Sequence, residues 1–430
     1  MTAPLFLGID LGTTGCRAIV VDPDGAEAAR STVALPPPRR PAPGHAEQDP
    51  AVWWEGVRQA TTGLPAPVRA AIAAVAVDGT SGTVVLADAA GAPLAPALMY
   101  DDTRAAGEAA SLRGVAPDTA AVHAATSGLA KALWLSARIR AGAARLVQQA
   151  DWVLGRLCGR PGLGDEHNAL KLGYDPVARH WPAWLADTKL PVAWLPVVLP
   201  AGEPVGPLSP EAATALGLPP SALAVTGTTD STAAAIASGV CTAGDAVTAL
   251  GTTMVMKVLA PQPIWSAAYG VYAHRVGDLW LVGGASNCGG AVLRQHFDDA
   301  ALAALSERID PAHASPLDYY PLPRRGERFP VSDPTLEPRL TPRPADPVAF
   351  LHGLLEGLAA VETLAYRRLA DLGAPYPSRV LTTGGGAANP AWTAIRARRL
   401  GVPVAPAPYA DAAHGAALLA RRGYLAHGAR

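Results

Sequence analysis

The chain has 430 residues, of which 50% are hydrophobic and 17% charged, and its formal net charge is −1. The length predicts two or three domains, and the hydrophobic share predicts ordered cores rather than disorder. A net charge near zero argues against a general nucleic-acid-binding surface. Lysine is rare and occurs only at Lys131, Lys171, Lys189 and Lys257, so arginine supplies nearly all of the positive charge.

The cysteines and the apolar segments indicate the cellular compartment in which the protein is expected. Four widely spaced cysteines form no CxxC pair, so neither a zinc site nor a disulfide framework is expected, and a reducing cytoplasm fits. The first apolar run has no basic residues before it and meets Asp10, which indicates a strand rather than a signal peptide. Residues 258–273 lack ionised side chains but contain prolines, and no membrane-spanning segment is expected.

The first half of the chain alternates strands, helices and polar turns. Residues 5–10 and 18–21 predict a hairpin across a Gly-Thr turn, and Asp49-Pro50 predicts the N-cap and first residue of a helix. The segments that follow are expected as a strand over 73–77, a hairpin of 84–88 with 94–100, helices over 104–157, and an irregular stretch over 181–220.

A sequence pattern from the start of the chain is repeated just after its middle. A strand over 222–226 is expected to lead into a Gly227-Thr-Thr turn before Asp230, followed by an alanine-rich helix to about 239. Residues 246–254 then repeat the pattern of residues 8–15, in which a strand is followed by Leu-Gly-Thr-Thr. The placement of this match at the start of each half predicts a duplicated domain, with a boundary near residue 240.

The remaining elements complete an α/β pattern. Strands are expected over 269–273, 279–282 and 380–382, with helices over 348–372 and from Asn389-Pro390 to Gly401. The fold class is therefore α/β, with two related domains, 1–239 and 240–430, facing one another across a cleft.

Three glycine-rich turns follow strands and predict a nucleotide site. They are Gly12-Thr13-Thr14, Gly251-Thr252-Thr253 and Gly384-Gly385-Gly386. Glycine lets backbone N–H groups approach phosphate closely, and threonine hydroxyls add neutral donors. A single such turn would be no more than a tight turn. No GxxxxGK[ST] segment and no strand followed by GxGxxG occurs, so a P-loop and a Rossmann site are excluded.

Acidic residues at strand ends are the candidates for chemistry. Asp10 ends the first strand, where a carboxylate would hold Mg²⁺, or else would only cap the turn. Asp230 precedes a helix, where a general base and an N-cap are both consistent with the sequence. Asp101, Asp102 and Arg104 suit polyol binding, with a solvated strand end as the alternative.

Taken in order, five segments resemble the FGGY carbohydrate kinases. They are Leu7–Thr14, Glu47–Pro50, Gly227–Asp230, Leu250–Thr253 and Gly384–Ala387, and they cover nearly the whole chain. The resemblance implies two actin-like (ribonuclease H-like) ATPase domains, ATP and Mg²⁺ in the cleft, and phosphoryl transfer to a sugar hydroxyl. It places the sugar and the first phosphate loop in 1–239, and the second phosphate loop and the adenosine in 240–430.

Carried over position by position, the resemblance implies roles for individual residues. Asp230 is similar to the family's catalytic base, and Asp10 and Asp230 are expected near the metal. The nucleotide-binding positions are Gly12, Thr13, Thr14, Gly251, Thr252, Thr253, Gly284, Gly385, Gly386, Ala387 and Asn389. The sugar-binding positions are Asp10, Thr80, Ser81, Gly82, Asp101, Asp102, Arg104 and Asp230.

The segment after the third strand bears on the substrate. Xylulokinases usually carry Gln-Met-His-Gly there, whereas this chain has Asp78-Gly-Thr-Ser-Gly82. This segment, with residues 98–104, 168–174 and 284–287, resembles a compact xylulokinase-like subgroup that acts on D-ribulose. The expected reaction is therefore the phosphorylation of D-ribulose to D-ribulose 5-phosphate. D-xylulose is the alternative substrate.

Two other functions remain open at this point. One is a nucleotide-switched, actin-like interaction protein, which would need no polyol site, and the other is a degenerate regulatory homologue of a sugar kinase. The expected partners are a small sugar and ATP, without nucleic acid or membrane, in the cytoplasm. A homodimer is compatible with the sequence, which does not specify the oligomeric state.

Overall fold

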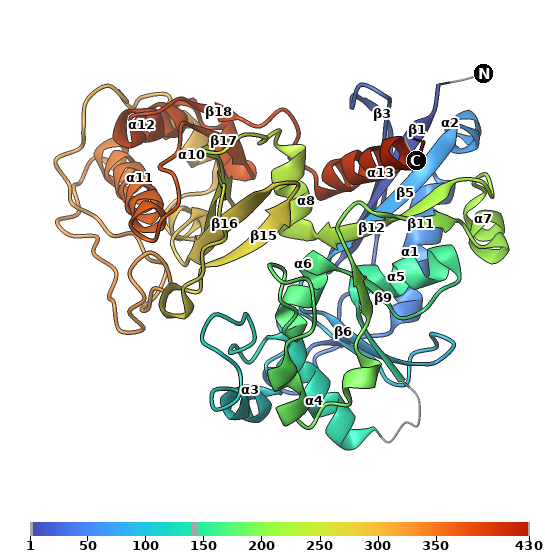
Figure 1. Ribbon diagram of the computed structural model, residues 1–430. Coiled ribbons are helices and arrows are strands. Elements are labelled where there is room, and N and C mark those ends of the chain that lie inside the picture. The colour runs from blue at the N-terminus through green and yellow to red at the C-terminus, as the bar shows by residue number, and fades with distance from the viewer. Residues whose placement is uncertain (1–2, 140–143, 429–430) are drawn as a thin grey trace. The chain divides into compact units, whose positions relative to one another are not determined.

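The computed structural model describes residues 3–139 and 144–428, which form two compact units (Figure 1). Unit 1 comprises residues 1–237 and 411–430, and unit 2 comprises residues 238–410. The sequence analysis assigned the whole of 240–430 to the second domain. The last helix, α13, belongs instead to unit 1, because its apolar side packs on the strands of that unit.

Unit 1 is built on a six-stranded sheet of order β11-β12-β5-β1-β2-β3. Strands β1, β5 and β12 run parallel, and β2, β3 and β11 are antiparallel to their neighbours. The strands are β1 (Leu5–Leu11), β2 (Gly15–Val21), β3 (Glu27–Ala34), β5 (Ile72–Gly79), β11 (Pro204–Pro207) and β12 (Leu223–Thr229). The central strands are almost continuously buried because both faces of the sheet are covered, whereas the edge strand β3 alternates in burial.

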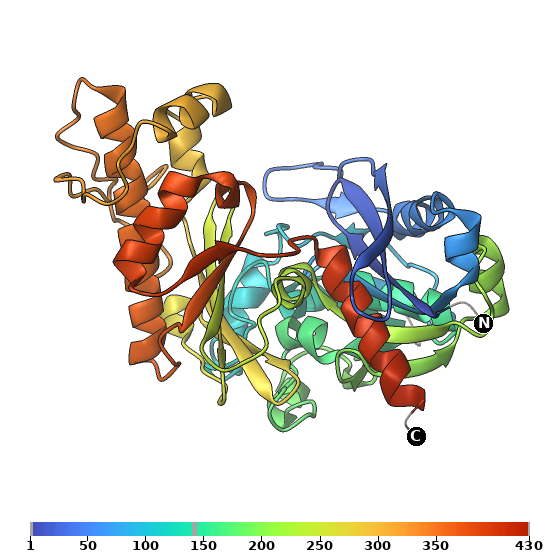
Figure 2. The same cartoon turned by 90° about the horizontal axis from the view of Figure 1, so that it is seen from above.

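Helices cover both faces of this sheet. The helices α1 (Pro50–Thr62), α5 (Gln149–Cys158) and α7 (Pro210–Leu216) contribute to the core on one face, which includes the edge-to-face pair Trp53 and Trp152. On the other face lies α13 (Ala412–Gly428), which runs along β1 in Figure 2. The approach is close, since a Cβ added at Gly8 would lie 1.9 Å from the carbonyl oxygen of Ala413.

A second, smaller sheet extends unit 1 and holds the loops treated below. Its order is β4-β7-β6-β8, and helix α4 (Gly128–Arg138) packs on it together with α3 (Ala106–Leu112). The strands are β4 (Glu47–Gln48), β6 (Val84–Asp88), β7 (Ala97–Leu98) and β8 (Ala144–Gln148). The predicted helical stretch over 104–157 was wrong where β8 interrupts it, because β8 pairs with β6 along its whole length. Residues 140–143 of that stretch lie outside the described residues.

Short elements join the smaller sheet to β12. They are β9 (Leu163–Asp165), α6 (Glu166–Ala169), the 3₁₀ turns Leu170–Leu172, Ala183–Asp187 and Val192–Trp194, and β10 (Val197–Leu199), whereas α2 (Ala66–Ala70) lies between α1 and β5. The segment 181–220, expected to be irregular, therefore contains β10, β11 and α7.

Unit 2 repeats the plan of unit 1. Its sheet has the order β15-β16-β14-β13-β17-β18, with β13, β17 and β18 parallel and β14, β15 and β16 antiparallel to their neighbours. Read from β18 to β16, this matches β12 to β3 of unit 1, so the duplication predicted from the repeated Leu-Gly-Thr-Thr is confirmed in the strand order. The strands are β13 (Asp245–Leu250), β14 (Met254–Ala260), β15 (Tyr272–Val276), β16 (Leu279–Ser286), β17 (Arg379–Thr383) and β18 (Val404–Pro406).

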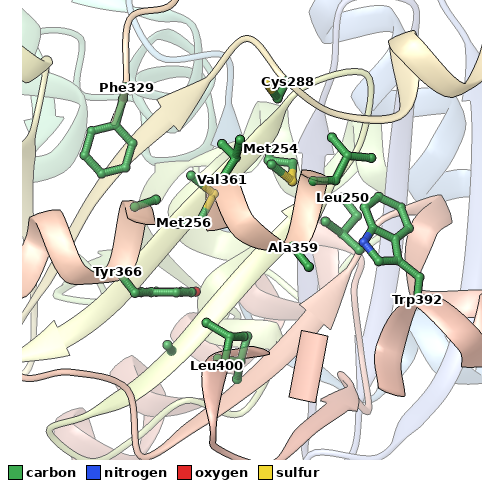
Figure 3. Packing of buried hydrophobic residues seen from close by; sticks show 14 of the residues in the cluster. Leu250, Met254, Met256, Cys288, Phe329, Ala359, Val361, Tyr366, Trp392 and Leu400 are labelled. Atoms are coloured by element: carbon green, nitrogen blue, oxygen red, sulfur yellow. The ribbon is translucent and has the colours of Figure 1, made fainter. Parts of the chain in front are cut away.

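The core of unit 2 lies between its sheet and α11 (Pro347–Asp371) (Figure 3). Asp346 caps α11, and α12 (Pro390–Leu400) lies alongside it, from its N-cap at Asn389 to Gly401 in the left-handed conformation. The remaining helices are α8 (Asp230–Ala237) in unit 1, and α9 (Gly290–Arg294) and α10 (Asp299–Ser306) in unit 2. By length and hydropathy α11 could cross a membrane, but 72% of its most apolar window is buried inside the protein, as in a core helix.

Candidate functional site

The parallel strands of unit 1 bring most of the predicted sugar and catalytic residues to one edge of the sheet. Asp10 on β1 is in register with Asp78 on β5, and Asp78 is in register with Thr228 on β12. Asp230 follows directly as the first residue of α8. Because parallel strands end on the same side, the Gly12 turn, the Thr80 turn and Asp230 share this edge.

Asp10 is nearly buried and is paired across the hairpin. Its Oδ2 accepts from Arg17 Nη1 at 2.7 Å, and Arg17 lies opposite Asp10 in the register of β1 and β2. Burial raises the pKa of Asp10, while the hydrogen bond from Arg17 opposes the rise. Beyond it, Gly12 N donates to Gly15 O at 2.9 Å, so the predicted first phosphate loop is a hairpin turn with Thr14 exposed.

Asp78 is a third carboxyl at this edge, and the sequence analysis did not select it. The residue is fully buried, and its carboxyl oxygens accept no hydrogen bond from the described residues, while its interaction with the Asp10 carboxyl favours the protonated form. Burial, followed by the charges of Asp10 and Asp230, raises the pKa of Asp78 well above its usual range. The position of Asp78 at the end of a buried strand, in line with Asp10, was the signal that could have identified it.

Asp230 begins α8 after a strand rather than after a turn. Ser231 N donates to Asp230 Oδ1 at 2.6 Å, so the carboxylate accepts from a backbone N–H in the first turn of α8. The predicted Gly227-Thr-Thr turn was wrong, because β12 continues to Thr229 through a register shift between Val225 and Thr228. A Cβ at Gly227 would lie 1.7 Å from Val77 O, so glycine is required here for the close approach of β12 to β5.

The predicted sugar-binding turn Thr80–Gly82 is fixed by side chains from its surroundings. Gln149 Oε1 accepts from Thr80 N and from its hydroxyl, at 2.9 and 2.8 Å, and Gln148 Oε1 accepts from Gly82 N at 2.7 Å. The Thr80 hydroxyl is thus engaged within the protein. By contrast, the buried Ser81 Oγ has no hydrogen-bond partner there.

The predicted sugar-binding residues Asp101, Asp102 and Arg104 lie in two different environments. Asp102 is fully buried, and its carboxylate accepts from Ala46 N at 2.6 Å and from Arg104, whose guanidinium also lies over Trp134. Asp102 and Arg104 therefore support the loop. Asp101 is partly exposed, with Oδ2 paired to Arg40 at 2.6 Å and a buried Oδ1 that has no partner within the protein.

In unit 2, two of the predicted nucleotide turns lie at neighbouring strand ends. Strands β13 and β17 are parallel with Ala249 opposite Thr383, so Gly251 and Gly384 follow at the same edge. The Gly251–Thr253 loop is tied to the start of α9, because Gly290 N donates to Gly251 O at 2.8 Å and Ala291 N donates to Thr252 O at 3.1 Å. Arg294 Nη2 donates to the Thr252 hydroxyl at 3.3 Å.

The Gly384 turn is shaped by its packing on β13. Gly384 has a φ of 82°, and a Cβ at Gly386 would lie 2.6 Å from the ring of Trp392, which neighbours Leu250 in Figure 3. Gly385 to Ala388 form a 3₁₀ turn, and Asn389 caps α12 through Trp392 N at 2.9 Å. Glycine at 384 and 386 is thus required by packing on Leu250 and Trp392, whereas a Cβ at Gly385 would meet nothing within 4 Å.

Gly284 is placed differently from the other predicted nucleotide positions. It lies within β16 opposite Met256, and a Cβ there would be 2.8 Å from Phe329. The role of glycine at this position is therefore to make room for the Phe329 ring in the core rather than to form a strand-end turn.

The carboxylates of unit 1 suit a magnesium ion. Among residues 3–139 and 144–428, no group of three His, Cys, Asp or Glu side chains could hold a metal by itself. Mg²⁺ usually takes only one or two carboxylates and completes its shell with water and phosphate oxygens. Asp10 and Asp230 at one edge fit that requirement.

Comparison with known proteins agrees with this geometry. The N-terminal domain of the FGGY family of carbohydrate kinases matches residues 5–237, and the C-terminal domain matches residues 246–424. The chain therefore belongs to the FGGY family of carbohydrate kinases.

Similar proteins in the family include xylulose kinases, and others are named glycerol kinase and autoinducer-2 kinase. A "Xylulose kinase" of Streptomyces coelicolor is 29% identical over 439 residues, covering 93% of this chain and 84% of that protein. A "Xylulose kinase" of Klebsiella pneumoniae is 29% identical over 263 residues, and that match spans about half of the relative, 53%. A solved structure of a "xyloylose kinase" from Brucella ovis is 26% identical with a TM-score of 0.87, covering 98% of this chain and 91% of that one.

Proposed function

We propose that this chain phosphorylates a ketopentose with ATP, and that its preferred substrate is D-ribulose. The observation that carries the proposal is the edge of unit 1, where Asp10, Asp230 and the Thr80–Gly82 turn follow three adjacent parallel strands. Carboxylates beside a polar turn suit a sugar whose hydroxyl must be held and deprotonated. The proposal goes beyond the names of the relatives, several of which are xylulose kinases and none of those cited a ribulose kinase.

The roles of the residues follow from their chemistry. When bound, ATP would supply the phosphoryl group and Mg²⁺ would neutralise its charge, with Asp10 and Asp230 as the holding carboxylates. Asp230 accepts the proton of the attacking hydroxyl. The turns at Gly12, Gly251 and Gly384 offer backbone N–H groups and threonine hydroxyls to the nucleotide. Positioning supplies most of the acceleration in phosphoryl transfer, and a base typically adds ~10²–10⁴-fold.

The choice of D-ribulose rests on the Asp78–Gly82 segment, which has no Met-His pair. D-ribulose and D-xylulose differ only at C3, and a site built to pair one epimer's hydroxyl leaves polar atoms unpaired with the other. Ser81 Oγ and Asp101 Oδ1 are buried polar atoms without hydrogen-bond partners among the described residues, and we assign them to the sugar hydroxyls.

An ADP-release assay with both ketopentoses tests the proposal. We expect a higher kcat/KM for D-ribulose than for D-xylulose, and we expect Asp101→Ala to raise the sugar KM more than the ATP KM. Asp118→Ala, at an exposed position of the same unit, is the matched control. Equal or reversed efficiencies would overturn the D-ribulose preference and leave only a carbohydrate kinase, and sugar-independent ADP release would favour a nucleotide-switched interaction protein.

A further inference from the structure

Lys131 is a fully buried cation that lies outside the catalytic edge of the sheet. It projects from α4, and its Nζ donates to three backbone carbonyls, those of Gly82 at 2.8 Å, Met99 at 2.6 Å and Tyr100 at 3.2 Å. Burial, followed by the charge of Lys171, lowers the pKa of Lys131 to about 7. An ammonium group has three N–H bonds to donate, so the three carbonyls match the charged form.

These carbonyls belong to two separate segments of the chain. Gly82 lies in the Thr80–Gly82 turn after β5, while Met99 and Tyr100 follow β7 and directly precede Asp101. The side chain of one lysine therefore ties together the two segments that carry the proposed sugar contacts. The three bonds go to backbone atoms, which fixes the course of both loops.

A second lysine reinforces the first segment. Lys171 Nζ donates to Ser81 O at 3.2 Å, and its side chain lies 3.3 Å from the position that a Cβ on Gly82 would take. Gly82 has a φ of 90°, so a side chain there would be strained as well as crowded. Two of the four lysines of the chain thus hold adjacent carbonyls of one turn.

The held segments carry polar side-chain atoms that the protein does not use. Ser81 Oγ and Asp101 Oδ1 are buried and have no hydrogen-bond partner within the protein. The Thr80 hydroxyl and the Asp102 carboxylate, by contrast, are engaged by the protein itself. The lysine bonds are thus made to the loops that present Ser81 and Asp101.

We propose that Lys131, supported by Lys171, is a positioning residue that sets the spacing between Ser81 and Asp101 and thereby the discrimination between ketose epimers. This inference rests on the proposed function. Buried polar atoms discriminate strongly only when they are held rigidly, because a mobile partner can follow either epimer. Removal of the lysine would cost sugar recognition and leave the nucleotide turns of unit 2 unchanged.

The test compares Lys131→Met and Lys171→Met with Lys189→Met, a lysine variant at an exposed position of the same unit. We expect Lys131→Met to raise the D-ribulose KM about tenfold or more and to move the ratio of kcat/KM for the two epimers toward one. The ATP KM is expected to stay within about twofold. Lys171→Met, which loses one bond at a partly buried site, should show the same pattern more weakly, and Lys189→Met should show none.

Loss of thermal stability alone, with an unchanged sugar KM and epimer ratio, would overturn the inference. If Lys131→Met does not fold, Lys171→Met decides, because an unchanged epimer ratio there contradicts the proposal and a reduced ratio supports it. A wild-type protein that releases no ADP with any ketopentose would overturn the proposed function, and this inference with it. If the wild type phosphorylates a ketopentose and the lysine variants keep its sugar KM and epimer ratio, only this inference is overturned.

Discussion

The three aspartates at one sheet edge differ in the partners that surround their carboxyl groups. Asp10 is paired with Arg17, and Asp230 lies at the start of a helix, where its side chain accepts from Ser231 N. Asp78 accepts no hydrogen bond from the described residues, and its interactions with the Asp10 carboxyl outweigh the weaker effect of the Arg17 charge. A buried carboxyl without partners costs free energy, and such costs concentrate at functional sites.

For Asp230 we expect Asp230→Asn to lower kcat by ~10²–10⁴-fold while the protein still binds ATP. The amide has a similar shape and can still accept from Ser231 N, but it cannot take a proton from the sugar. Steady-state ADP release and nucleotide titration calorimetry measure the two effects. Near-normal kcat in a folded variant would reduce Asp230 to a helix cap.

For Asp78 we expect Asp78→Asn to stabilise the protein, and more so at pH 8 than at pH 5. The pKa of Asp78 is raised in the folded state, so the unfolded chain binds fewer protons above pH 4, and the stability of the wild type falls as the pH rises toward the folded pKa. The uncharged amide of the Asp78→Asn variant does not ionise, so the variant does not lose this stability as the pH rises. Melting temperatures of both proteins at the two pH values check the sign, and a gain independent of pH would contradict it.

Among the elements, α11 and α12 are joined by a buried ion pair that apolar periodicity does not reveal. Arg396 and Glu362 are both fully buried, and the guanidinium donates to the two carboxylate oxygens at 2.6 and 2.7 Å. The Thr248 hydroxyl on β13 donates to the same carboxylate at 2.5 Å, and Arg396 also reaches Thr382 on β17. The pair therefore connects both helices to the strands that lead into the Gly251 and Gly384 turns.

We expect Arg396→Met to lower the free energy of unfolding by about 3–5 kcal/mol, because it leaves Glu362 buried without a cation. Urea denaturation measures the change. The double variant Arg396→Met with Glu362→Leu should lose less than the single variant, since no unpaired charge remains. A double variant less stable than the single one would contradict this expectation, because Glu362 would then stabilise the fold even without its cation.

Local chemistry in the sequence predicted some elements well and others poorly. The caps at Asp49 and Asn389 and the stop at Gly401 were correctly predicted, because each acts through its own neighbouring backbone. Strand β8 was missed because its pairing with β6 is nonlocal. The requirement for glycine at Gly227 likewise comes from Val77 on β5, so it was misread as a turn.

At the scale of the whole molecule, the repeated Leu-Gly-Thr-Thr predicted two related units, and the strand orders confirm this. The sequence did not reveal that α13 returns to unit 1, because its alanine-rich pattern fits either unit and its contacts lie about 400 residues away. The roles of Asp102, Gly284 and Lys131 were likewise unreadable, since they depend on partners from distant segments.

Unit 2 is one continuous stretch of chain, whereas unit 1 is made of two. We expect residues 238–410 expressed alone to unfold cooperatively on heating, and residues 1–237 alone to lack a cooperative transition. The fragment of residues 1–237 lacks α13, which covers the apolar residues Phe6, Ala74 and Val225 of the sheet. A sharp melting transition of 1–237 would show that α13 is dispensable.

The return of α13 to unit 1 also has a consequence for synthesis on the ribosome. Chains emerge from the N-terminus, and domains generally fold as they appear. Here the sheet of unit 1 is complete after residue 237, yet its cover is translated only after the 173 residues of unit 2. At roughly 5–20 residues per second, the nascent sheet waits about ten to forty seconds with one apolar face open. That interval is when a chaperone would be needed and when a stalled nascent chain would be most prone to aggregate.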